Sequence, residues 1–248
     1  MPIQSRADAV PVLLTRPQAQ GAAFARQVTD RFGDRLRIVL SPLMAPRFLQ
    51  PTLPEGPVSA LIITSQTGVQ ALARLGALTK TLPRHVFCVG TQTAQSLRDL
   101  GFQPVGVAPD AARLIDVIKL QNPTGRLLCL QGRDVRGNIA ESLISAGIDT
   151  VSAIIYSQEA QALSLEATAM LQSDSPMIAP LFSPRSARIF SAELARLHSV
   201  SPLFAAVISG ETAIALSAPT QQIRVAVTPD AASMLDQIAL LMTDIQRA

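Results

Sequence analysis

The stretch VAPDAARLIDVI at residues 107–118 has a close counterpart 120 residues later, VTPDAASMLDQI at residues 227–238. Other similar pairs lie at nearly the same separation, namely Ser65 and Ser183 (118 residues), Gly90 and Gly210 (120 residues), and Arg16 and Arg133 (117 residues). A common strand–helix pattern explains each pair alone but not the shared separation. The spacing therefore predicts that the chain contains an internal duplication.

Short apolar runs alternate with helical patterns along the whole chain. The strand-like runs lie at residues 12–14, 36–40, 60–63, 86–89, 105–107, 127–130, 151–155, 179–182, 205–208 and 223–227. Strands that alternate with helices are typical of an α/β fold with parallel sheets covered on both faces. Ten strands are many for one open sheet, so we predict two sheets of about five strands each.

Both copies of the opening stretch contain a proline followed by an aspartate. The pattern predicts a helix start, with Pro109 and Pro229 just inside the helix and Asp110 and Asp230 in its first turn. We therefore assign these segments to helix capping and give them no functional role.

Composition and charge exclude several classes of protein. The chain has 248 residues, of which 48% are hydrophobic, and a formal net charge of +3 without a basic stripe. This balance suits small anionic ligands better than nucleic acid, so no nucleic-acid partner is expected. No apolar run reaches the ~18 residues of a membrane span, and the run at residues 10–14 is shorter than the roughly 7–15 residues of a signal peptide. These features predict a cytoplasmic protein with no membrane partner.

Cysteine and histidine do not form a site in the sequence. Cys88 and Cys129 each lie inside an apolar run, which predicts two reduced core thiols. His85 and His198 lie far apart and have no ligand partners at metal spacing. Neither a zinc site nor a Ser-His-Asp triad is supported, and no metal or other cofactor is expected.

Four polar turns follow apolar runs and precede helical patterns. They are Thr64-Ser65-Gln66-Thr67-Gly68, Gly90-Thr91-Gln92-Thr93, Ser183-Pro184-Arg185-Ser186 and Gly210-Glu211-Thr212. Such turns lie at the carboxyl ends of parallel strands, where free backbone N–H groups bind anions. Their hydroxyls also serve as helix caps, which is the more common use of a single Ser or Thr. No G-x-G-x-x-G is present, and GRDVRG at residues 132–137 lacks the end of a phosphate loop, so a nucleotide ligand is disfavoured.

A set of short motifs in this order resembles the uroporphyrinogen-III synthase family. The motifs are Leu13-Leu14-Thr15-Arg16-Pro17, Ile62-Ile63-Thr64-Ser65, Val89-Gly90-x-x-Thr93-Ala94, Ile155-Tyr156, Phe182-Ser183-Pro184 and Gly210-x-Thr212-Ala213. The resemblance implies two similar parallel-sheet, flavodoxin-like domains joined by a two-stranded linker, with a cleft between them. It implies a discontinuous domain at residues 1–39 and 158–248, a second domain at residues 44–153, and linkers near residues 40–43 and 154–157.

The resemblance also implies a reaction. The enzyme would be a lyase that closes hydroxymethylbilane, a polycarboxylate tetrapyrrole, with loss of water and inversion of the last pyrrole ring, in haem biosynthesis. It would need no cofactor and is expected to be a monomer. Tyr156 matches the family's tyrosine and would act as the catalytic acid. The residues expected to bind substrate are Arg16, Ser65, Gly90, Thr93, Ser183, Arg185, Gly210 and Thr212.

Two positions depart from the family's pattern. Gln66 and Thr67 leave the first turn without the basic residue that some relatives have near it, and Glu211 places a carboxylate in a turn expected to bind anions. Two other classes stay open on the sequence alone. One is a two-lobed protein that binds a small anion or solute without catalysis, and the other is a nucleotide-binding transferase.

Overall fold

The computed structural model describes residues 9–134 and 137–247. The chain divides into two compact units, Met1–Ala45 with Ala160–Ala248 and Pro46–Glu159. Each unit contains its own sheet, and the strands of each sheet pair in parallel wherever their register is defined. The prediction of two parallel sheets in an α/β chain is therefore confirmed.

The first unit has a five-stranded sheet in the order β11-β10-β9-β1-β2. Its strands are β1 (Val10–Leu14), β2 (Leu36–Leu40), β9 (Met177–Leu181), β10 (Leu203–Val207) and β11 (Gln222–Val225). Its helices are α1 (Gln18–Phe32), η2 (Gly33–Arg35), α6 (Leu165–Leu171), α7 (Pro184–Leu197), α8 (Gly210–Ala215) and α9 (Ala231–Arg247). Because β1 pairs with both β2 and β9, the opening strands share a sheet with strands from the end of the chain.

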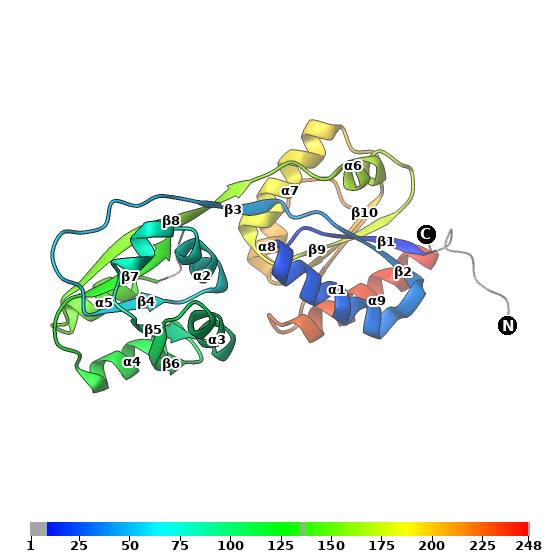
Figure 1. Ribbon diagram of the computed structural model, residues 1–248. Helices are drawn as coiled ribbons and strands as arrows, with labels where there is room; N and C mark the ends of the chain where they lie inside the picture. The colour runs from blue at the N-terminus through cyan, green and yellow to red at the C-terminus, as the bar shows by residue number, and fades with distance from the viewer. Residues whose placement is uncertain (1–8, 135–136, 248) are drawn as a thin grey trace. The chain divides into compact units, whose positions relative to one another are not determined.

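Helices cover both faces of the first sheet (Figure 1). Neighbouring residues of a strand point to opposite faces, so Leu13 packs with α6 and α7 while Leu14 packs with α1 and α9. The side chains of both clusters are almost entirely buried. This two-sided burial explains why the strands are continuous apolar runs rather than alternating ones.

The second unit has a six-stranded sheet in the order β3-β8-β7-β4-β5-β6. Its strands are β3 (Met44–Phe48), β4 (Ala60–Ile63), β5 (His85–Val89), β6 (Gln103–Ala108), β7 (Leu127–Gly132) and β8 (Thr150–Ala160). The first two residues of β3 and the last residue of β8 fall within the bounds of the first unit. Its helices are α2 (Gln66–Ala73), η3 (Gly76–Lys80), α3 (Thr91–Asp99), α4 (Ala111–Gln121) and α5 (Ile139–Ser145). Helices α2 and α3 pack on one face of the sheet, and α4 and α5 pack on the other (Figure 1).

Strand β3 is not among the strands predicted from the sequence. Its residues are Met-Ala-Pro-Arg-Phe, and none of them is fully buried. It lies at the edge of the sheet beside β8, where the proline does not interrupt a ladder on both sides. An edge strand with this composition has neither of the hydrophobic patterns by which strands are recognised.

The helix starts at α4 and α9 correct one expectation. Asp110 is the N-cap of α4 and accepts from the N–H of Arg113 at 2.8 Å, and Asp230 accepts from the N–H of Ser233 at 2.8 Å. Pro109 therefore precedes the cap of α4 and does not lie inside the helix. Pro229 has the equivalent position before α9. A side chain that accepts from the N–H three residues later at a helix start is in the cap position.

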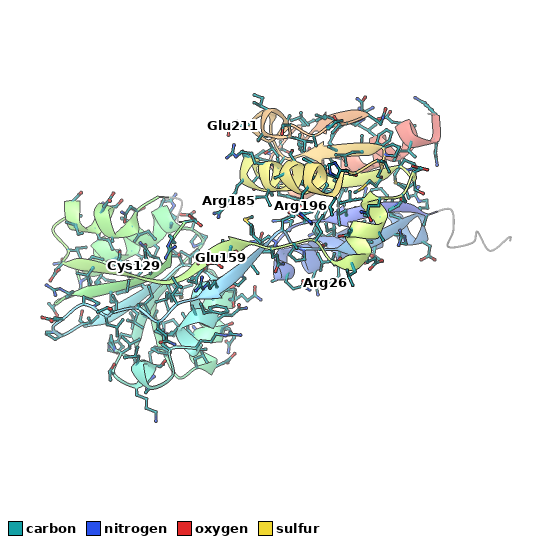
Figure 2. All side chains as sticks on the ribbon, turned by 90° about the horizontal axis from the view of Figure 1, so that it is seen from above. Arg26, Cys129, Glu159, Arg185, Arg196 and Glu211 are labelled. Carbon is teal, nitrogen blue, oxygen red and sulfur yellow. The ribbon has the colours of Figure 1, made fainter. Side chains whose placement is uncertain are left out.

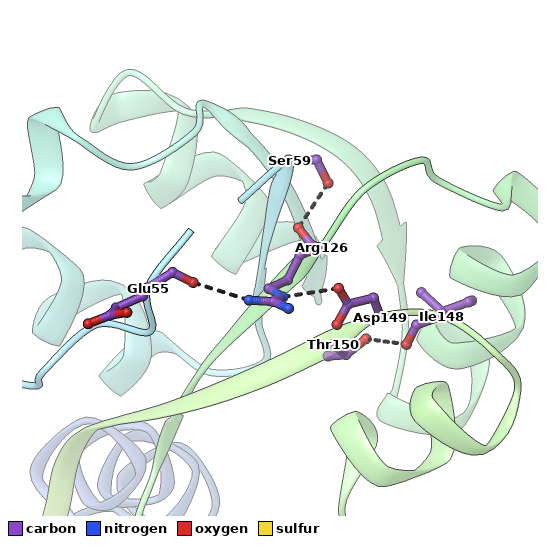
Figure 3. A network of polar contacts seen from close by, with 6 residues as sticks. All are labelled: Glu55, Ser59, Arg126, Ile148, Asp149 and Thr150. Carbon is purple, nitrogen blue, oxygen red and sulfur yellow. Dashed lines mark hydrogen bonds and ion pairs between the residues drawn. The ribbon is translucent and has the colours of Figure 1, made fainter. Parts of the chain in front are cut away.

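The amino ends of three strands in the second unit are joined by Arg126 (Figure 3). Its guanidinium donates to a carboxylate oxygen of Asp149 at 3.0 Å and to the carbonyl of Glu55 at 3.1 Å. Its own carbonyl accepts from the hydroxyl of Ser59 at 3.0 Å. These hydrogen bonds connect the segments that precede β4, β7 and β8.

In the described part of the chain, no helix has the length and hydropathy of a membrane span. Residues 1–8, which open the segment compared with a signal peptide, lie outside the described residues. So do residues 135–136 of the stretch compared with a phosphate loop.

Candidate active site

Tyr156 lies near the carboxyl edge of the second sheet. It is on β8 opposite Gly132, the last residue of β7, at a point where the register of the two strands shifts. Its ring lies directly over the α-carbon of Gly132, and its hydroxyl is 3.2 Å from the hydroxyl of Ser65. The side chain is only partly buried. The structure therefore brings together the expected acid on β8 and one expected binding residue in the turn after β4.

Ser65 holds the turn between β4 and α2. It is the N-cap of α2, and its hydroxyl oxygen accepts from the N–H of Gly68 at 3.0 Å. The same oxygen pairs with the hydroxyl of Tyr156. One serine thus accepts from a free N–H at the start of α2 and also fixes the position of the phenol. Its contacts are compatible both with helix capping and with a role in the site.

Gln66 links this turn to α3, a role that the sequence did not indicate. Its amide nitrogen is 3.4 Å from the hydroxyl oxygen of Thr93, and its amide oxygen accepts from the hydroxyl of Ser96 at 3.2 Å. An amide can both donate and accept, so it joins two hydroxyls one helical turn apart. A basic side chain at this position could not accept from Ser96, which gives the departure from the family's pattern a structural explanation.

Thr93 is directed inward rather than toward solvent. Its residue is 5% exposed, and Gly90 before it is the N-cap of α3 with φ of 84°. This left-handed conformation favours glycine, and the cap has no side-chain hydrogen bond. The first N–H groups of α3 thus have no side chain that satisfies them at the cap, which leaves them available to an anion.

In the first unit, Ser183 caps α7. Its hydroxyl accepts from the N–H of Ser186 at 3.1 Å, and Pro184 follows as the first helical residue. The hydroxyl of Ser186 lies 2.8 Å from that of Ser183 and 2.9 Å from its carbonyl. This turn is a well-formed helix start at the carboxyl end of β9.

The Gly210 turn differs from the Gly90 turn, and the expected equivalence of the two glycines is wrong. The N-cap of α8 is Ser209, whose hydroxyl accepts from the N–H of Thr212 at 3.3 Å, and Gly210 is the first helical residue. Thr212 is fully buried, and its hydroxyl lies 3.1 Å from that of Ser209. A cap with a side-chain acceptor has no need of a left-handed glycine, so Ser209 occupies the position of Gly90.

Arg16 follows β1 at the carboxyl edge of the first sheet. Its guanidinium carbon lies 3.9 Å from the centre of the Phe182 ring, and one of its terminal nitrogens donates to Gln20 at 3.2 Å. Its Nε is buried without a hydrogen-bond partner. Burial lowers the pKa of the guanidinium from its usual value, although an arginine stays charged at any physiological pH. A partly buried, incompletely bonded guanidinium favours an anionic partner.

Arg185 and Glu211 occupy the second positions of α7 and α8 in the first unit (Figure 2). Both side chains are exposed. They place opposite charges on neighbouring helix starts. Exposure of Glu211 lets its carboxylate remain in solvent, which reduces but does not remove its repulsion of an anion.

The cysteines have the core positions expected of them. Cys88 and Cys129 are both buried and free. Burial raises the pKa of the Cys129 thiol to about 12. Among the described residues, no group of three His, Cys, Asp or Glu side chains could hold a metal ion.

We therefore expect Cys129 to react with iodoacetamide only after unfolding, since the thiolate is the reactive form and is scarce in the native protein at about pH 8. Mass spectrometry of native and urea-treated samples measures this directly. Rapid alkylation of Cys129 in the native protein would contradict its burial.

Comparison with known families decides the class of protein. The model of the family described as uroporphyrinogen-III synthase HemD matches residues 36–236. The chain belongs to the uroporphyrinogen-III synthase family. Membership makes it a lyase of tetrapyrrole and haem biosynthesis, and nothing supports the solute-binding alternative.

Two solved structures of uroporphyrinogen-III synthases are similar to this chain. A uroporphyrinogen-III synthetase from Helicobacter pylori has 19% identity and a TM-score of 0.57, with 94% of this chain and 99% of that chain covered. A mutant uroporphyrinogen III synthase from Thermus thermophilus has 15% identity and a TM-score of 0.43, with 95% of this chain and 100% of that chain covered. The first likeness supports the synthase fold. Comparison with curated proteins found no significant match.

Proposed function

We propose that this synthase closes hydroxymethylbilane into uroporphyrinogen III with Tyr156 as the catalytic acid. The observation that supports this role is the position of its phenol, partly buried at the carboxyl edge of a parallel sheet and paired with Ser65 at 3.2 Å. Ligands bind at this edge in open α/β sheets. The phenol would donate its proton to the terminal hydroxyl of the substrate, which leaves as water.

The proton balance of this step needs no cofactor. Loss of water leaves the tyrosinate of Tyr156 and a cationic tetrapyrrole, which closes through a spiro intermediate as the last ring inverts. The proton that the pyrrole carbon then releases can return to the tyrosinate. The hydroxyl oxygen of Ser65 accepts from the N–H of Gly68, and its hydrogen is left to donate. Ser65 can therefore donate a hydrogen bond to the tyrosinate oxygen until the proton returns.

We propose that both units hold carboxylates of the substrate, each at the carboxyl edge of its own sheet. Arg16 and the turns at Ser183 and Gly210 would act in the first unit, and the turns at Ser65 and Gly90 in the second. Arg185 adds positive charge at the start of α7. Such contacts would keep a flexible chain folded so that the correct carbon attacks.

The two compact units would then be the two domains of the family, with a discontinuous first domain. We further propose a cytoplasmic monomer that has no nucleic-acid partner. The modest net charge of +3 supports the last point. Size-exclusion chromatography with light scattering would test the oligomeric state.

Thr93 and Thr212 would support the turns from within, because both side chains are buried. We expect Thr93→Ala and Thr212→Ala each to weaken substrate binding by about 1–3 kcal/mol, since backbone donors in the same turns remain. The loss should appear in KM and as leakage toward the type I isomer, which forms spontaneously without ring inversion. A larger loss of kcat than Tyr156→Phe produces would mean that the assigned roles are reversed.

Full activity is expected after exhaustive dialysis against a chelator, because the proposed proton donor and carboxylate contacts all come from the chain. The measurement is the rate of uroporphyrinogen III formation before and after treatment. Loss of activity that a metal ion or nucleotide restores would refute a mechanism without cofactors.

A further inference from the structure

We propose that Gly132 is a positioning residue, whose missing side chain provides the space in which the phenol of Tyr156 rests. This inference rests on the proposed role of Tyr156 as the acid. The contact itself joins β7 and β8 of one sheet and does not depend on that role.

The space above Gly132 is filled by one ring. A β-carbon at this position would lie 2.6 Å from Cε2 and 2.6 Å from Cζ of Tyr156, and 3.0 Å from the hydroxyl oxygen. Carbon atoms make favourable contacts only near about 3.5–4.0 Å, so the ring and a methyl group cannot both occupy their places. Every side chain larger than hydrogen at residue 132 would therefore displace the phenol.

Backbone conformation gives no other reason for this glycine. Gly132 is not among the described glycines with positive φ, unlike Gly90. An L-residue could adopt its φ without strain, so what singles out glycine here is space rather than torsion. A glycine in a strand often marks such a close approach.

The position of the phenol is also fixed by hydrogen bonds. The hydroxyl of Ser65 is 3.2 Å from its oxygen, and the N–H of Arg133 donates to the carbonyl of Tyr156 at 2.9 Å. The backbone of β8 is thereby fixed beside the end of β7, with the register shift placing Tyr156 opposite Gly132. The ring lies on Gly132 while its oxygen is bound to Ser65, so a small displacement would break the hydrogen bond that sets the direction of the acid.

The protein contains its own probe for this contact. Tyr156 is the single tyrosine, and the chain has no tryptophan. Tyrosine fluorescence therefore reports on this residue alone. Its quenching by acrylamide measures how accessible the ring is, whether or not the residue takes part in catalysis.

A matched control is available in the same sheet. Gly106 lies on β6, also without a positive φ, and a β-carbon there would lie 2.6 Å from the ring of Phe87. Gly106→Ala therefore introduces an equally short contact with an aromatic ring of the core. It should lower the melting temperature while leaving tyrosine quenching and kcat unchanged.

The experiment compares Gly132→Ala, Gly106→Ala, Tyr156→Phe and the double variant Gly132→Ala/Tyr156→Phe. We expect Gly132→Ala to increase tyrosine quenching and to lower kcat by about 100-fold, as a misplacement of about 1 Å does, with a small change of KM. In the Tyr156→Phe background the same substitution should have no further effect on kcat, because the acidic hydroxyl is already absent. If Tyr156→Phe is fully active, the proposed acid role fails, yet the quenching result still decides the position of the ring.

Unchanged quenching and kcat in Gly132→Ala would overturn the proposal. So would an equal loss of kcat in the wild-type and Tyr156→Phe backgrounds. If Gly132→Ala does not fold, Gly132→Ala/Tyr156→Ala should restore folding, because it removes the ring that the methyl group strikes. Failure of that rescue, measured by circular dichroism, would place the clash elsewhere and also overturn the proposal.

Discussion

Tyr156→Phe should slow formation of uroporphyrinogen III by roughly 10²–10⁴-fold, the usual contribution of a general acid. The substitution removes one oxygen and leaves the ring over Gly132, so the fold should survive. Substrate binding should change little, because the proposed carboxylate contacts are made by other residues. The loss should therefore appear in kcat rather than in KM.

Chromatographic separation of the product isomers at several substrate concentrations measures this effect. The control is Ser65→Ala, which keeps the phenol but removes its hydrogen-bond partner, and which should cost less than Tyr156→Phe. A rate near that of the wild type for Tyr156→Phe would exclude the acid role and leave a mechanism based on conformation alone.

Arg16→Gln should raise KM by about 10- to 150-fold, because a hydrogen bond to a charged group is worth about 1.5–3 kcal/mol. The guanidinium lies on the ring of Phe182, and its buried Nε has no partner. A substrate carboxylate bound by the guanidinium would compensate its charge. Arg16→Lys should recover only part of the affinity, since an ammonium group has no planar fork.

The matched control is Arg26→Gln on α1 of the same unit, an exposed arginine that Figure 2 also labels. It removes the same charge from the protein and should leave KM within about twofold, since charges in solvent are screened beyond the Debye length. Equal effects of the two substitutions would show that Arg16 acts only through net charge.

The sequence predicted the parts of the fold that have strong periodic patterns. Buried strands such as β4 and β10 are continuous apolar runs, and their alternation with helices predicts parallel sheets. Ser65 and Ser183 were predicted as turn residues at strand ends, and both cap the helices that follow. These features are local, so they can be read from short stretches of sequence.

Other features depend on contacts between distant segments, and the sequence did not reveal them. Gln66 bonds to Thr93 and Ser96, which belong to α3, about 30 residues further along the chain. Gly132 matters because β8 places Tyr156 over it. Neither contact leaves a periodic signal.

The two glycine turns show how a repeat can mislead in detail. The glycines at 90 and 210 are 120 residues apart, but the N-caps are Gly90 and Ser209, which are 119 apart. The threonines at the third helical positions keep that same spacing of 119 residues. The cap and the threonine are therefore the equivalent positions, whereas the second glycine is not.

The most direct measurement incubates the purified chain with hydroxymethylbilane and separates the uroporphyrinogen isomers after a fixed time. Without an enzyme the substrate closes to the type I isomer. We predict that the type III isomer predominates, and that Tyr156→Phe shifts the product back toward type I. Type I alone, formed at the rate seen in buffer, would contradict the assignment of this chain as a working uroporphyrinogen-III synthase.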